Sequence, residues 1–419
     1  MYMNMPLTAD GAWSPNFAVH YPRMFIYVYK MTFSVVLGGA ASFRVAMFFV
    51  LPARILGTRY LLRGGLANLA DSSVRRMPRI MFPVFMAALL EYFLIEVSTF
   101  RWLIRLPSRT WNTWSYYENY ANLGEFINSF ISLWFVAPPQ QPALVQRYAI
   151  GILWTVPLMI QLTWSLFLCA IIARQIPHHG KRWAFYSICI GLNWYADRFD
   201  TLFLLGLAVA DLDAKLNYRS WPGLRLWPAS LEERFATLRK CRIPAQLFAW
   251  ILFFVGFGFA WCEVSGKGPS DLTVKELRIR PDFFTGNPRG WADPDLTLAY
   301  NDLKFTCILP VLSFYLLCDL NKYFAKAFSL RIWQVIGKHS FGVFLLHGAV
   351  FWSWGSFCMV NLLVAGLPYW AANLINFITS YALLAVCAVI FTNTADKWGA
   401  WISVALWRSV SRGYGRREK

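Results

Sequence analysis

The sequence predicts an all-α fold, a polytopic transmembrane helix bundle of about ten helices, on three observations. Hydrophobic residues make up 57% of the 419 residues and charged residues only 15%, against roughly 25% charged residues in an average soluble protein. Apolar runs long enough to cross a membrane recur along the chain, and basic residues gather between alternate runs. If a chain of this size and composition were soluble, it would have too few polar residues to cover its surface. Lipid is therefore the solvent that the composition requires.

An apolar run of roughly 17–25 residues can cross a bilayer as a helix. The region 24–57 has room for two short spans, or for one long span after a half-helix. Two shorter pieces, 183–195 and 199–212, form either two thin spans or a hairpin that returns to the same side. Clear spans are expected at 80–97, 148–172, 245–262, 303–320, 333–354 and 371–391.

The charge distribution gives the expected topology. The chain carries 40 Lys and Arg against 22 Asp and Glu, hence a net charge of +18. Ten spans with a cytosolic N-terminus place 25 basic residues inside and 10 outside, as the positive-inside rule requires. We therefore expect one domain over residues 1–419, non-cytosolic loops at 98–147 and 263–302, and a basic cytosolic tail at 392–419. The lipid bilayer accounts for the charge, so no nucleic-acid partner is expected, and no cysteine spacing indicates a metal site.

One histidine lies inside the span expected at 333–354. His347 follows Ser340 by seven residues, so both side chains share a helix face. An ionisable residue in a membrane span is a candidate functional residue, because a neutral imidazole can accept a proton from an attacking hydroxyl. A structural histidine bonded to a neighbouring helix is the alternative, and spacing alone favours it.

Three arginines lead into the span expected at 80–97. Arg75, Arg76 and Arg79 follow an inside loop, and guanidinium groups at such a place can bind phosphates, for instance those of a nucleotide-bearing donor. The alternative is an ordinary positive-inside anchor. The arginines alone favour the anchor.

Five segments of the chain, taken in order, resemble the acyltransferase 3 family. The resemblance is to its fungal branch of integral membrane acyltransferases, which is of the secondary-metabolism type. The resemblance covers about residues 40–400. The segments are Phe48-Phe49-Val50-Leu51, Arg75-Arg76-x-x-Arg79-x-x-x-Pro83, Leu153-Trp154-Thr155-Val156-Pro157, Phe203 to Asp213, and Ile336 to Phe341 with His347. Each motif by itself is degenerate, but the five motifs together, in this order, are fairly specific.

The resemblance implies about ten transmembrane helices and an O-acyltransferase that moves an acyl group, often acetyl, from acyl-CoA to a hydroxyl. The acyl-CoA is a co-substrate, and no bound cofactor is implied. The acceptor would be a lipophilic hydroxylated small molecule such as a fungal secondary metabolite. The membrane would be the endoplasmic reticulum or another internal membrane, and other enzymes of the pathway are possible partners. Arg75, Arg76 and Arg79 would bind the donor, and His347 or Ser340 would orient the base or the acyl group.

The chain also departs from the family pattern. The family has a histidine in its first helix as the general base, and the nearest counterpart here is His20, about 28 residues before Phe48. Met159 stands where the family usually has Glu, and Pro52-Ala53 replaces Ser-Gly. A transporter or flippase with the same fold, or a non-catalytic scaffold, is the alternative function that these departures leave open.

Overall fold

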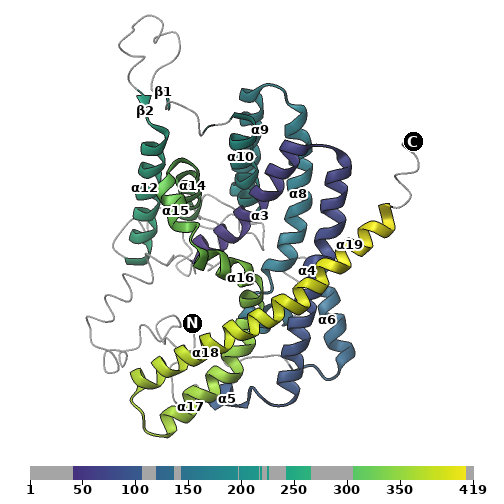
Figure 1. The fold of residues 1–419 in the computed structure, drawn as a ribbon, viewed down its shortest axis with the longest axis vertical. Helices are drawn as coiled ribbons and strands as arrows, with labels where there is room; N and C mark the ends of the chain where they lie inside the picture. The colour runs from purple at the N-terminus through teal and green to yellow at the C-terminus, as the bar shows by residue number, and fades with distance from the viewer. Residues whose placement is uncertain are drawn as a thin grey trace, which may run out of the picture. The chain divides into compact units, whose positions relative to one another are not determined.

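The computed structural model describes residues 41–105, 119–135, 143–196, 198–216, 218, 224–225, 242–265 and 305–411. These residues are helical apart from turns and one two-residue pairing, in which β1 (Leu224–Arg225) lies antiparallel to β2 (Arg242–Ile243). The predicted all-α fold is confirmed (Figure 1). Five helices in the described part are long and apolar enough to cross a membrane, or six if one bent pair counts as a span. The protein is therefore a multi-pass helical membrane protein.

The helices form two compact units. Unit 1 comprises Met1–Tyr27, Ala70–Ile160 and Arg331–Lys419, and unit 2 comprises Val28–Leu69 and Gln161–Leu330. The expectation of a single domain over the whole chain stays a prediction.

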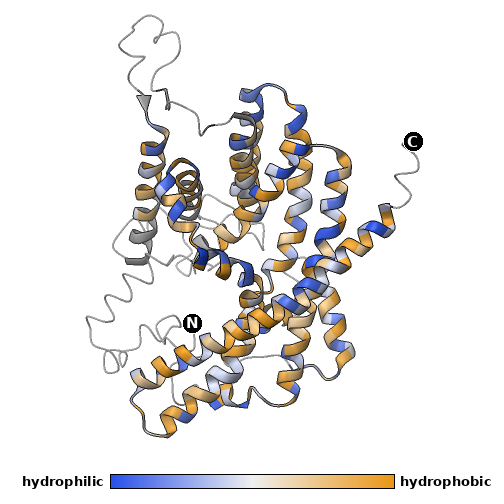
Figure 2. Cartoon of the chain, viewed as in Figure 1, coloured by the Kyte–Doolittle hydropathy of each residue, from blue (hydrophilic) through white to orange (hydrophobic). Residues whose placement is uncertain are grey.

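Unit 1 contains two unusually long helices. Arg331–Val364 is continuous over 34 residues and Tyr369–Ser411 over 43 residues. Each passes through a turn of π-helix, η7 (Phe351–Gly355) or η8 (Thr392–Asp396), which joins α16 (Arg331–Val350) to α17 (Ser356–Val364) and α18 (Tyr369–Phe391) to α19 (Lys397–Ser411). Residues 392–411 of the expected tail are thus helical. Figure 2 shows that α17 and α18 are mainly hydrophobic.

Shorter elements complete unit 1 around α4 (Leu66–Glu96), which enters this unit at Ala70. They are α5 (Arg101–Arg105), α6 (Leu123–Phe135), α7 (Ala143–Arg147), the turn η4 (Ala149–Gly151) and the start of α8 (Thr155–Gln175). Helices α5, α6 and α7 lie in the segment that the sequence assigns to a non-cytosolic loop. Their buried side chains join one apolar core with those of α4, α16 and α18.

Unit 2 is built around the packing of α3 (Ala41–Arg63) on α10 (Asp200–Leu216). A methyl group on Gly206 would lie 2.7 Å from the carbonyl oxygen of Val50 and 2.8 Å from Cβ of Ala53, so the backbones approach closely. Small residues allow such contact between membrane helices. Two of the five motif segments, those beginning at Phe48 and Phe203, therefore meet here.

The other described helices of unit 2 are α9 (His179–Tyr195), α12 (Ala245–Ser265), α14 (Phe305–Leu320) and α15 (Lys322–Phe328). Of these, α9, α12 and α14 agree with the expected apolar segments, whereas α15 lies in a segment that the sequence assigns to a basic inside loop. The chain bends by 105° between α14 and α15. Asn321 caps α15 at this bend, because its side chain accepts hydrogen bonds from the backbone N–H groups of Tyr323 and Phe324.

Candidate functional site

His347 lies near the middle of the 34-residue helix of unit 1, about 24 Å along it from Arg331. Its Nδ1 lies 2.7 Å from the carbonyl oxygen of Phe344, one turn earlier. A carbonyl oxygen can only accept, so Nδ1 carries the proton and the lone pair of the neutral ring is on Nε2. The imidazole is thus held in the tautomer that a general base needs.

Aromatic rings flank this imidazole. The ring centroid of Phe344 lies 6.4 Å from that of His347, and the ring of Phe351 meets it edge-on at 6.1 Å. No acidic side chain of the described residues forms an ion pair with His347. The described neighbours of the ring are therefore aromatic and uncharged.

The residue after His347 contacts a strained turn. Gly348 lies so close to η4 that a methyl group there would be 2.6 Å from Cα of Ala149. Ala149, Ile150 and Gly151 have φ values of 50°, 58° and 69°, a left-handed conformation that is an outlier for a β-branched residue. Such strain costs on the order of 1–3 kcal/mol per residue and clusters at functional sites.

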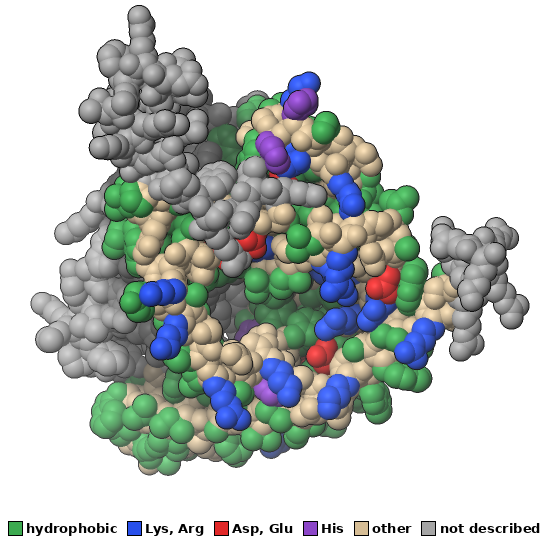
Figure 3. Space-filling model, turned by 45° about the horizontal axis from the view of Figure 1, so that its top comes forward, with side chains coloured by type: hydrophobic (Ala, Val, Ile, Leu, Met, Phe, Trp, Pro, Cys, Tyr) green, Lys and Arg blue, Asp and Glu red, His purple; other side chains and the backbone are tan. Residues whose placement is uncertain are grey.

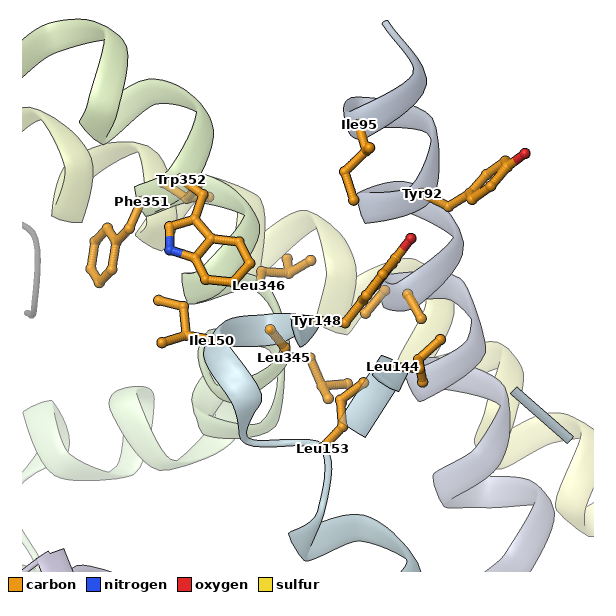
Figure 4. Close-up of a cluster of buried hydrophobic side chains, with 14 of the residues drawn as sticks. Tyr92, Ile95, Leu144, Tyr148, Ile150, Leu153, Leu345, Leu346, Phe351 and Trp352 are labelled. Carbon is orange, nitrogen blue, oxygen red and sulfur yellow. The ribbon is translucent and has the colours of Figure 1, made fainter. Parts of the chain in front are cut away.

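Glu91 of α4 holds this turn from another side. Its carboxylate Oε2 accepts a hydrogen bond of 2.9 Å from the backbone N–H of Ala149. The side chain is 2% exposed, and Oε1 has no partner among the described residues. Figure 4 shows Tyr148 directed toward α4 and Ile150 on the same side of the turn as Trp352. Non-helical backbone at membrane depth is tolerated where protein buries it or where it lines a cavity, so this turn is a candidate part of a site.

Sequence reasoning missed both Glu91 and the turn. Glu91 could have been found, because it is an ionisable residue inside the apolar segment 80–97 and such residues are functional candidates. The turn gives no such signal. Only Gly151 of its three residues favours a left-handed backbone.

Ser340 is placed differently from His347. Its side chain is exposed, and its hydroxyl donates a hydrogen bond of 2.8 Å to the carbonyl oxygen of Gly337 in the same helix. Two turns, or about 10 Å, separate the two residues along the axis. The two residues thus lie on one helix, and the hydrogen bonds of their side chains go to different backbone carbonyls. His20 lies outside the described residues.

The three arginines of α4 have different surroundings. Arg75 forms an ion pair of 3.3 Å with Asp71, one turn before it, and the side chain of Arg79 is exposed. Arg76 lies inward, and its Nε and Nη2 atoms are buried without a hydrogen-bond partner in the described part of the chain. A buried guanidinium with unused donors is costly unless an anion binds it. Arg76 is therefore the arginine best placed to bind a phosphate.

The motif that ends α10 has a structural role in unit 2. Asp211 is fully buried and accepts a hydrogen bond of 2.7 Å from Nε of Arg182. Arg182 also donates to the carbonyl oxygen of Ile176 at 3.2 Å and lies 2.8 Å from Nδ1 of His179. Asp211, the first carboxylate of this motif, thus forms an ion pair with Arg182 inside unit 2.

A second ion pair lies within unit 2. Arg54 of α3 contacts both Asp319 and, at 3.8 Å, Asp213. The hydroxyl of Tyr218 donates to Asp319 as well, and burial next to this carboxylate raises the pKa of Tyr218 above its ordinary value. Every charge in the cluster has a partner. It stabilises the packing of helices, as expected for charges that must be neutralised in lipid.

Comparisons of the chain with models of protein families, with curated proteins and with solved structures find no match.

Proposed function

We propose that this multi-pass membrane protein is an O-acyltransferase that moves an acyl group, often acetyl, from acyl-CoA to a hydroxyl of a lipophilic small molecule. The single observation that carries the proposal is the hydrogen bond that fixes Nδ1 of His347 and leaves the lone pair on Nε2. An imidazole in a membrane helix without a charged partner is positioned to remove a proton. The order of the motif segments in the sequence is the supporting argument.

The proposed reaction needs one proton acceptor and one proton donor. Nε2 of His347 takes the proton from the acceptor hydroxyl as the oxygen attacks the thioester carbonyl. The tetrahedral intermediate then expels the CoA sulfur, and the imidazolium returns the proton to that sulfur. The products are an ester and free CoA, so atoms and charges balance.

The donor would bind through its phosphates at Arg76, where two guanidinium nitrogens are buried without a protein partner. Phosphate oxygens are the ligands that such a group binds bidentately. A hydrophobic acceptor would reach the site from the bilayer, and we place the protein in the endoplasmic reticulum or another internal membrane.

The test is an acetyl-transfer assay with membranes that contain the full chain. Labelled acetyl-CoA and a panel of hydroxylated terpenoids and polyketides are supplied, and labelled ester is extracted and counted. We expect His347→Ala to lower turnover about 10²-fold or more at an unchanged protein level. His178→Ala is the matched control, because His178 is exposed and directly precedes helix α9 of unit 2. Ester formation at the normal rate in His347→Ala would contradict the proposed base.

A further inference from the structure

Helix α15 of unit 2 turns sharply away from α14, the apolar helix before it. The chain bends by 105° at this point, and Asn321 caps α15 there, because its side chain accepts hydrogen bonds of 2.9 and 3.0 Å from the N–H groups of Tyr323 and Phe324. Aromatic contacts hold the angle as well. The ring centroid of Phe314 in α14 lies 5.4 Å from that of Phe324 and 5.0 Å from that of Phe328. The bend is therefore a packed feature of the fold.

The lysines of α15 argue against a helix that continues into the hydrocarbon. Two of its seven residues are lysines, Lys322 and Lys326, and an ammonium group inside the bilayer is costly. Helix α14 alone supplies 16 residues, or about 24 Å of the roughly 30 Å that a span must cross. If α14 crosses the membrane, a helix bent from it by 105° runs nearly parallel to the membrane surface. The headgroup region is therefore the place that suits α15.

The two sides of α15 differ in chemistry. One side lies against its own unit, because the ring of Phe324 is 5.9 Å from that of Trp250 and 6.3 Å from that of Phe253, both in α12. Lys322 precedes Phe324 by two residues and thus points away from these contacts. Lys322 and Lys326 are both exposed and are one turn apart, so their ammonium groups share a helix face. A seated helix thus presents two fixed positive charges outward.

These two lysines have no acidic partner in the part of the chain that the structure describes. Neither forms an ion pair there. Asp319, the nearest acidic residue in the sequence, is paired with Arg54 and accepts a hydrogen bond from Tyr218, and the next acidic residue is Asp396. Basic side chains also predominate over acidic ones on the face that Figure 3 presents. The charge of α15 thus favours an anionic partner outside the protein.

Tyr323 adds an aromatic ring to the exposed side of α15. It is 73% exposed, and Nζ of Lys322 lies 5.1 Å from its ring centroid. Tyrosine is enriched at membrane interfaces, where its ring lies at headgroup level, and lysine beside it can keep its ammonium group among the headgroups while its methylene chain lies on apolar surface. The combination fits a lipid surface.

We propose that the outward face of α15, formed by Lys322, Tyr323 and Lys326, binds the headgroups of anionic phospholipids. The two ammonium groups contact the phosphate and carboxylate oxygens of the lipid, and the tyrosine ring lies between headgroups. The cytosolic leaflet carries the anionic lipids, and it is the side on which the positive-inside rule places the segment 321–331. This inference does not rest on the proposed function.

The experiment measures lipid binding by the purified full chain in detergent micelles. Phosphatidylserine is titrated, and native mass spectrometry gives the dissociation constant of the first bound lipid; phosphatidylcholine is the neutral comparison lipid. The variants are Lys322→Gln, Lys326→Gln, the double Gln variant and the double variant Lys322→Arg with Lys326→Arg. Lys181→Gln is the matched control, because Lys181 is an exposed lysine of α9 in the same unit.

We expect the wild type to bind phosphatidylserine more tightly than phosphatidylcholine. Each single Gln variant should weaken phosphatidylserine binding about fivefold and the double Gln variant about 25-fold, the scale of one and two basic residues at an anionic surface. Phosphatidylcholine binding should not change. The double Arg variant keeps both charges and should bind like the wild type, and Lys181→Gln should stay within about twofold.

Three results would overturn the proposal. Equal affinity of the wild type for the two lipids would show that α15 does not select charge. An equal loss in Lys181→Gln and Lys322→Gln would show that only the summed charge of the protein matters. Wild-type affinity for phosphatidylserine in the double Gln variant, with thermal unfolding unchanged, would leave the outward face to another occupant, such as an acidic protein segment.

Discussion

The two units differ in how their buried ionisable groups are paired. In unit 2, Arg182 is paired with Asp211 and Arg54 with Asp319, although Oδ1 of Asp211 has no hydrogen-bond partner among the described residues. In the described part of unit 1, the guanidinium of Arg76 has donors without acceptors, and Glu91 has one carboxylate oxygen without a donor. A paired charge in lipid is explained by stability, whereas a group with unused hydrogen-bonding capacity calls for a proton, a substrate or another ligand. Arg76, which forms no ion pair with a described residue, is therefore the strongest candidate for binding a ligand.

The largest expected effect tests the structural half of this comparison. Arg182→Met leaves the fully buried Asp211 without its cation, and breaking a buried pair in this way costs about 3–5 kcal/mol. Thermal unfolding of the protein in detergent micelles should therefore begin at a markedly lower temperature. The double variant Arg182→Met with Asp211→Leu removes both charges and should recover much of the loss. Equal destabilisation in the single and the double variant would show that the pair is not what stabilises unit 2.

The next effect concerns the contact beside His347. In Gly348→Ala the added methyl group would overlap the backbone of Ala149, and overpacking of this kind costs about 1–3 kcal/mol. Gly337→Ala is a matched control in the same helix, because nothing lies within 4 Å of the methyl group it adds. Thermal unfolding should separate the two variants. If Gly348→Ala unfolds at the wild-type temperature, α16 does not press on the turn η4 in solution.

A smaller effect is expected at Glu91, where two substitutions separate hydrogen bonding from charge. Glu91→Leu leaves the buried N–H of Ala149 without an acceptor, which costs about 1–3 kcal/mol. Glu91→Gln keeps an amide oxygen that can accept the same hydrogen bond, so its thermal unfolding should stay close to that of the wild type. A Gln variant as unstable as the Leu variant would mean that the charge of Glu91, rather than its bond to the turn, stabilises unit 1.

The sequence predicted the helices better than it predicted the site. Apolar runs located the membrane-spanning helices, since a span must be apolar over about 20 residues. The same rule underestimated the last helix. This helix continues beyond its apolar part, through Asn393 and Lys397 to Ser411. Spacing placed His347 deep in its helix and the three arginines together on α4. The pair of Arg75 with Asp71 follows the i,i+4 spacing that the sequence already shows, whereas the burial of the Arg76 nitrogens is visible only in three dimensions.

That distinction leads to the smallest expected effect, which sharpens the comparison inside unit 1. Arg75 has Asp71 as its partner, whereas Arg76 has unused buried donors, so under the proposed function Arg76 is better placed than Arg75 to hold a donor phosphate. Arg76→Gln should raise the KM for acetyl-CoA about tenfold and leave kcat nearly unchanged. The reason is that a contact far from the reacting carbonyl binds ground state and transition state alike. Arg75→Gln is the matched control, and its KM should change much less. Initial rates over a range of acetyl-CoA concentrations separate the two parameters. An equal rise in KM for both variants would show that the arginines act through their summed charge, and a loss of kcat in Arg76→Gln would place its guanidinium at the reacting centre.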